Sequence, residues 1–265
     1  MCKKSITKVI LIVLAAASNC LAGCNAESLA YCPPEKTDAN EVEAVLKQLS
    51  RKTKELKSYQ CSFEYKFEQP LFESQTSRKG ELFYQKLDDR SILRVNFRTL
   101  KHDDEQQQKY AEDYLFDGVW LTKIDYQTKQ ANRYQQAEPN KPVDAFDLAS
   151  QDFPIVGFSK IPKLKEQFEI KFIKDNQGKE NDLIQLHLKV KPESVYKDDY
   201  TSIDFWIYKK LYLPGKIVSL TTEGDIHRID LLKARVNRAV DMDVFRLKIP
   251  KDFSLHVIPL EKENK

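Results

Sequence analysis

Residues 59–67 read YQCSFEYKF, and this stretch decides the fold class of the chain. Apolar or aromatic side chains occupy the odd positions, and polar side chains occupy the even positions. Successive side chains of a β-strand point to opposite faces of a sheet. The alternation therefore predicts a strand with one buried face and one face in water.

Similar alternating runs continue almost to the C-terminus. Turn signals such as Asp117-Gly118 and Pro214-Gly215 separate many of them. Most connectors are too short for a crossover helix, so we expect an antiparallel sheet of about eleven strands. Besides 59–67, the expected strands cover residues 80–86, 92–98, 110–116, 119–126, 168–174, 183–191, 202–208, 216–222, 226–235 and 245–249.

Two segments predict helices. Between Pro142 and Glu166, apolar residues occur without strand alternation, which indicates short helices that can cover the open mouth of a curved sheet. Ahead of the first strand, an amphipathic helix that packs on the sheet is predicted by a stripe of apolar residues at helical spacing. The stripe consists of Val42, Val45, Leu46, Leu49 and Leu56.

The N-terminus is typical of a bacterial lipoprotein. Three lysines precede a short apolar run at 9–17, and Leu21-Ala22-Gly23-Cys24 closes the signal. That run falls short of the roughly 20 residues needed to span a bilayer. We expect residues 1–23 to be a signal peptide, 24–39 a tether lipidated at Cys24, and 40–265 one folded domain.

Charge excludes one class of partner. Residues 1–23 hold three lysines and no acidic residue, so the remaining 40 Lys and Arg balance 40 Asp and Glu. A neutral mature chain lacks the basic excess that binds nucleic acid or anionic headgroups.

Motifs for catalysis are missing from the sequence. None of the seven glycines forms a phosphate-binding loop, and no zinc-protease or serine-hydrolase motif occurs. The four histidines stand singly, without metal-ligand spacing. We therefore expect no catalytic residue, metal or cofactor and predict that the chain is not an enzyme. A hydrolase with an unrecognised carboxylate pair is the least favoured hypothesis.

Five cysteines occur in the chain. Cys2 and Cys20 leave with the signal, and Cys24 takes the lipid. Cys32 and Cys61 remain, and they either pair or stay free thiols. A bridge would close a loop of about 30 residues and stabilise the fold by roughly 3 kcal/mol.

Several motifs, in order, carry a family resemblance. They are the helix-to-strand entry at 46–67, Gly80-Glu81-Leu82-Phe83-Tyr84, Leu115-Phe116-Asp117-Gly118, Pro214-Gly215-Lys216-Ile217 and the C-terminal stretch 243–251. From Val42 onward the chain resembles the LolA-like family of periplasmic lipoprotein carriers. The likeness spans about 200 residues, and the order of the weak motifs carries it.

This resemblance implies a mainly β, α+β fold: an unclosed antiparallel β-barrel with a helical lid over an apolar cavity that receives acyl chains. Lys86 falls where the family has a lid-fastening arginine, although lysine lacks the planar fork of arginine. By matched position, the cavity residues are Tyr59, Phe63, Phe83, Leu93 and Val95. The expected lid residues are Phe146, Leu148, Phe153, Ile155, Phe158 and Ile161.

Two functional hypotheses follow. In the first, a lipid-anchored envelope protein binds lipid or lipoprotein acyl chains in the cavity and works with a lipoprotein-release or acceptor protein. In the second, the sheet is filled by its own aromatic side chains, and a structural or signalling lipoprotein binds a protein partner and no lipid. The chain is expected to face the periplasm. Asn25 favours the outer membrane weakly, because it is not the aspartate that marks inner-membrane retention.

Replacing Cys24 by serine tests the anchor, because only the thiol can form the thioether to diacylglycerol. We expect Cys24→Ser to abolish incorporation of labelled palmitate and to release the protein from membranes in high salt. Continued labelling of the variant would contradict the lipoprotein signal.

Overall fold

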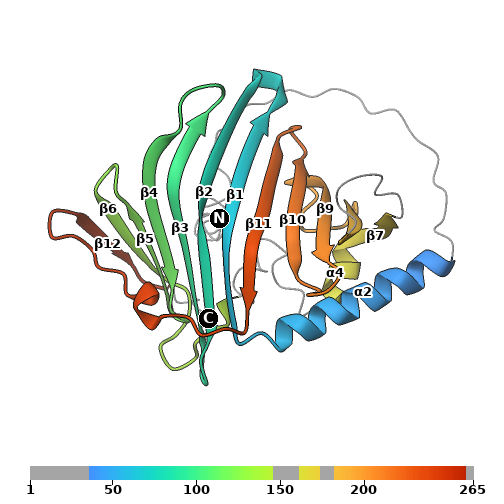
Figure 1. Ribbon diagram of the computed structural model, residues 1–265, viewed down its shortest axis with the longest axis horizontal. Helices are drawn as coiled ribbons and strands as arrows, with labels where there is room; N and C mark the ends of the chain where they lie inside the picture. Colours follow the sequence, from blue (N-terminus) through green and yellow to red (C-terminus); the bar gives the residue numbers. More distant parts are fainter. Residues whose placement is uncertain (1–35, 146–160, 174–181, 261–265) are drawn as a thin grey trace.

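The computed structural model describes residues 36–145, 161–173 and 182–260. Its strands form one twelve-stranded sheet in the order β12-β6-β5-β4-β3-β2-β1-β11-β10-β9-β8-β7 (Figure 1). The edge strands β12 and β7 do not pair with each other among the described strands, so the sheet is an unclosed barrel. The elements are α2 Lys36–Lys54, β1 Ser58–Gln69, η1 Pro70–Phe72, β2 Ser74–Lys86, β3 Ser91–His102, β4 Gln108–Phe116, β5 Trp120–Asp125, β6 Gln130–Gln135, α4 Ile161–Gln167, β7 Phe168–Ile173, β8 Leu183–Val190, β9 Tyr200–Tyr208, β10 Pro214–Thr221, β11 Ile226–Val236, η2 Met242–Phe245 and β12 Ser254–Ile258.

Strand β1 lies in the middle of the sheet and pairs with β2 and β11. Its odd-numbered residues from Tyr59 to Phe67 are buried, as the alternation predicted. Residues opposite each other on paired strands project to the same face. Phe63 therefore shares a face with Gly80 of β2 and Leu231 of β11. We call this the helix face, because α2 packs against it.

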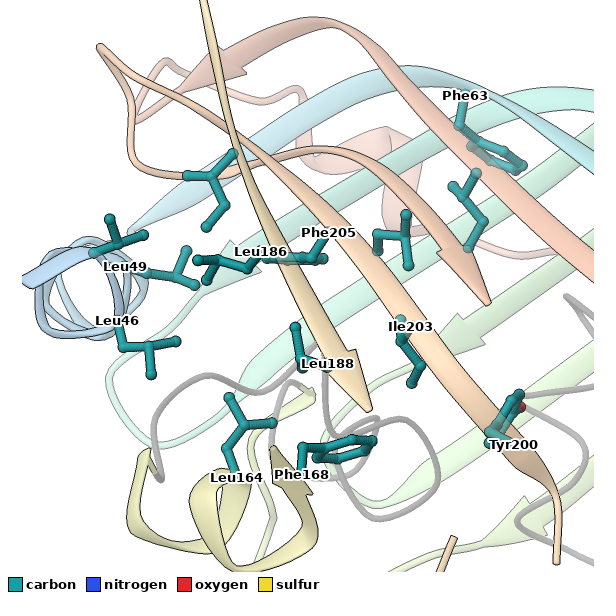
Figure 2. Packing of buried hydrophobic residues seen from close by; sticks show 14 of the residues in the cluster. Leu46, Leu49, Phe63, Leu164, Phe168, Leu186, Leu188, Tyr200, Ile203 and Phe205 are labelled. Atoms are coloured by element: carbon teal, nitrogen blue, oxygen red, sulfur yellow. The ribbon is translucent and has the colours of Figure 1, made fainter. Parts of the chain in front are cut away.

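The predicted amphipathic helix is confirmed as α2, which lies beside β7 and α4 (Figure 1). Figure 2 shows Leu46 and Leu49 of α2 directed toward Leu186 and Phe205 of the sheet. Leu56 follows the helix and joins a second cluster nearer the start of β1. The apolar stripe thus fixes which face of the sheet the helix covers.

The C-terminal segment lies against the opposite face. Arg94 Nη1 of β3 donates a hydrogen bond to the carbonyl oxygen of Val244. The rings of Tyr126 and Phe253 meet edge to face, with centroids 5.6 Å apart, and Phe245 is buried. Both faces of the sheet therefore have a covering segment.

The expected strand at 245–249 is wrong. Phe245 ends the short helix η2, and the last strand, β12, begins at Ser254. β12 pairs in parallel with β6, a strand whose sequence QANRYQ lacks clear alternation. Residues 237–253, which connect β11 to β12, are long enough to reach that edge of the sheet.

Replacing Leu49 by alanine tests the contact between α2 and the sheet. Leu49 is fully buried, so we expect a loss of about 2–5 kcal/mol in the free energy of unfolding. Lys47→Ala, on the exposed side of the same helix, should change it by no more than about 0.5 kcal/mol. Urea unfolding measures both, and equal effects would contradict the packing.

Candidate functional site

Two apolar clusters divide the helix face. The first joins α2 and α4 to β7–β11 and extends across β1 to Phe97 of β3 and Tyr114 of β4, and the second surrounds Tyr59 and Cys61 at the start of β1. Leu82 and Leu231 contact both clusters, while Val95 contacts the first and Leu93 the second. These four residues are only partly buried. We call Leu82, Leu93, Val95 and Leu231 the seam.

Strand register brings the seam together from β2, β3 and β11. Leu82 lies opposite Cys61 and Val95. Leu93 lies opposite Tyr84 and Phe116. Partly exposed apolar side chains between two packed clusters present an apolar surface that an apolar ligand can bind.

The structure separates the residues predicted to line a cavity. Leu93 and Val95 are in the seam, and Tyr59 and Phe63 are buried in the clusters beside it. Phe83 does not share the face of the other four. It lies opposite Gln60 and Arg94, on the face that the C-terminal segment contacts. A step of one residue reverses the face of a strand side chain. Acyl-chain contact by the other four stays a prediction.

A group of charges lies on the helix face beyond the seam. Arg78 Nη2 donates to Glu112 Oε2 over 2.6 Å, and Lys123 Nζ lies 3.5 Å from Glu112 Oε1. The Arg78 guanidinium also stacks on the Phe97 ring, 3.9 Å from its centroid. Glu112 is buried, and a buried carboxylate requires such partners. We call Arg78, Glu112 and Lys123 the ion cluster.

Tyrosines extend the polar part of this face. The Tyr114 hydroxyl donates to Glu112 Oε2 over 3.2 Å, and burial followed by the nearby Glu112 charge raises the pKa of Tyr114. The Tyr65 hydroxyl and His227 Nδ1 are hydrogen-bonded at 2.8 Å. Burial raises the pKa of Tyr65 as well. Both hydroxyls are therefore neutral at pH 7, and farther along β1 the helix face holds polar groups beside the buried rings of Phe67 and Phe97.

Cys61 is buried in the second cluster and has no disulfide partner among the described residues. Burial raises the pKa of Cys61 to about 12, although the nearby Tyr59 side chain acts in the opposite direction. A protonated thiol is a poor nucleophile. Cys32, its expected disulfide partner, lies outside the described residues, so the pairing stays a prediction.

The segment that leads toward the expected lid is attached to the helix face. The Ala145 N–H donates to Ser91 Oγ over 2.7 Å, and the Tyr84 hydroxyl donates to Asp144 Oδ2 over 3.3 Å. Lys86 is exposed and lies opposite Ser91. Of the expected lid residues, Phe146, Leu148, Phe153, Ile155 and Phe158 lie outside the described residues, and Ile161 is the first residue of α4.

Within the described ranges, no group of three or more His, Cys, Asp or Glu side chains is arranged to hold a metal ion. Over the same ranges, no helix has both the length and the apolar character to cross a membrane.

Sequence reasoning missed Leu82, Leu231 and the ion cluster. Leu82 and Phe83 are adjacent apolar residues of the same run, so the sequence does not decide which of the two projects to the helix face. Only the pairing of Leu82 with Cys61 decides between them. Arg78, Glu112 and Lys123 come from three different strands, and nothing local in the sequence links them.

No known protein family and no curated protein matches the chain by sequence. Solved structures do match its fold. An uncharacterized conserved protein from Thermus thermophilus is 10% identical with a TM-score of 0.47, and the match covers 83% of this chain and 99% of that chain. MucB in the Pseudomonas aeruginosa MucA/MucB complex is 12% identical with a TM-score of 0.47, over 78% of this chain and 61% of that chain. This chain thus spans about three fifths of the MucB chain.

The LolA superfamily, which the sequence motifs resemble, is among the matched structures. A LolA superfamily protein from Nitrosomonas europaea is 11% identical with a TM-score of 0.33, over 77% of this chain and 97% of that chain. At such identities and scores, the likenesses concern the fold alone and carry no argument about ligand or partner.

Alkylation tests the state of Cys61. Because its pKa is raised to about 12, the thiol stays protonated from pH 7 to pH 9, and we expect iodoacetamide to leave it unmodified in the folded protein. Unfolding in denaturant without reductant should expose it to full alkylation, measured by mass spectrometry of the Cys61 peptide. Modification only after reduction would mean that Cys61 is in a disulfide.

Proposed function

We propose that this chain is a lipid-anchored envelope protein that binds an acyl chain of a lipid or lipoprotein along the seam. The observation that carries the proposal is the row of partly buried Leu82, Leu93, Val95 and Leu231 between two packed clusters. A ligand that covers this row removes apolar surface from water at about 25 cal/mol per Å².

The energetics favour a long apolar ligand. Each buried methylene contributes about 0.8 kcal/mol, so ten methylenes contribute roughly 8 kcal/mol before the cost of ordering the chain. Arg78 and Leu82 both project to the helix face of β2, Arg78 opposite Tyr65 and Leu82 opposite Cys61. The ion cluster and the seam therefore occupy successive parts of the same face. An amphiphile bound along the strands therefore has its apolar part at the seam and its polar part toward the charges.

The proposed anchor limits how the protein works. Because α2 begins at Lys36, the proposed tether is shorter than the expected 24–39, and residues 24–35 extend at most about 40 Å. A fold held that close to the membrane acts on lipids or lipoproteins at that membrane and does not shuttle freely. This favours a receiving or sensing role in lipoprotein sorting over that of a diffusing carrier.

Leu93→Glu tests the proposal. An unsolvated carboxylate against an acyl chain costs several kcal/mol, so we expect binding of a fluorescent fatty acid to weaken at least about 100-fold. The fatty acid is titrated into residues 25–265, produced without signal or lipid. Stability should fall by only about 1–2 kcal/mol in a thermal melt, because Leu93 is not fully buried.

Ile92→Glu is the matched control. Ile92 is the neighbouring residue of β3, is partly buried like Leu93, and lies on the opposite face, paired with Gln85. It should keep the parent affinity. Equal loss in both variants, or no saturable binding by the parent, would defeat acyl-chain binding and leave the partner-binding alternative.

A further inference from the structure

Three turns at one end of the sheet form a single surface. The Asp103 N–H, after β3, donates to the carbonyl oxygen of Gln75 in β2 over 2.7 Å. On the other side, Gln69 Nε2 of β1 donates to Asp225 Oδ2, before β11, over 3.4 Å. Figure 1 shows the β1–β2 hairpin extending farthest at this end. We call residues 68–75, 102–107 and 221–226 together the acidic tip.

Two large apolar side chains project from the acidic tip. Leu71 is 82% exposed and Phe72 is 64% exposed, although both lie in an ordered turn of helix η1. Pro70 restricts the backbone before them, and Glu73 after them is left-handed with φ 50°. The Glu73 N–H donates to the Pro70 carbonyl oxygen over 3.2 Å. This closed turn holds Leu71 and Phe72 away from the sheet in a fixed backbone conformation. A partner that covers the two side chains therefore loses little free energy to ordering that backbone.

The charged side chains within the three turns have one sign. The three turns contain no lysine or arginine, although the chain without residues 1–23 has equal numbers of basic and acidic residues. Such a concentration of like charge creates a local field that selects a partner of opposite charge. The seven carboxylates are those of Glu68, Glu73, Asp103, Asp104, Glu105, Glu223 and Asp225.

We propose that the acidic tip docks a partner protein whose surface has an apolar pocket for Leu71 and Phe72 surrounded by lysine and arginine side chains. Apolar anchors buried in a pocket supply most of the binding energy of such interfaces. Charge complementarity around them sets the orientation and the association rate.

Two other occupants conflict with the charge. A membrane surface with anionic lipids carries the same sign as the seven carboxylates and repels them. A second copy of the chain, docking through the same surface in a symmetric dimer, would bring two acidic tips together. The proposal is independent of acyl-chain binding, because no seam residue belongs to the acidic tip.

Site-specific photocrosslinking tests the proposal in the full-length, anchored protein. Phe72 is replaced by photoreactive benzoyl-phenylalanine, and envelope vesicles of the producing bacterium are irradiated. Val195 carries the same probe as a control. It is 72% exposed on another loop, and its backbone N–H donates to Gln167 Oε1. We expect a discrete protein adduct at Phe72 that is absent at Val195, with lysine or arginine flanking apolar residues in the crosslinked peptide sequenced by mass spectrometry.

Charge reversal makes the test specific. In Asp104→Lys/Glu105→Lys/Glu223→Lys, three exposed acidic residues of the tip are reversed, and the yield of the adduct should fall at least about tenfold. Asp88→Lys/Asp89→Lys/Glu138→Lys makes the same change in net charge at exposed positions outside the tip and should leave the yield unchanged. A lipid adduct, equal labelling at Phe72 and Val195, or an adduct that survives reversal of the tip would each overturn the proposal.

Discussion

The pairing of β1 with β2 and β11 is the constraint on which the rest of the structure depends. Once the odd side chains of β1 are buried, register assigns a face to each neighbouring residue on both sides. The backbone of β2 packs closely against its neighbours at Gly80, which lies opposite Phe63 of β1. A Cβ there would collide with the carbonyl oxygen of Asn96 and approach the Phe63 ring. Glycine therefore allows β3, β2 and the Phe63 ring to pack together at this point.

The two faces of the sheet are covered by different parts of the chain, and the seam follows from that arrangement. α2 and α4 fill the helix face near β7, while the second cluster gathers near the start of β1. On the opposite face, the segment around Phe245 and Phe253 packs near β3 and β5. Leu82, Leu93, Val95 and Leu231 lie where the two clusters of the helix face meet, and there apolar surface stays partly exposed.

Charge is distributed in two contrasting ways. On the helix face, buried Glu112 has two cations, and on the opposite face buried Asp113 lies 3.0 Å from Arg94 and 3.1 Å from Arg98. Removing either carboxylate from water would cost several kcal/mol without these partners. The carboxylates of the acidic tip have no lysine or arginine within their own turns. Within the three turns themselves, the charged side chains beside Leu71 and Phe72 are therefore all acidic.

The sequence by itself determined the local structure of this protein. Alternation predicted β1 and most of the other strands, and helical spacing predicted α2, because both depend on neighbouring residues burying one side. The sequence did not predict β6 or β12, because the first lacks clear alternation and the second pairs with a strand far away in the chain. Nor could it place Phe83 and Leu82 correctly, since adjacent strand residues differ only in the face that register assigns. Only the tertiary structure brought Arg78, Glu112 and Lys123 together and set three acidic turns side by side, because those contacts join strands and turns that are distant in sequence.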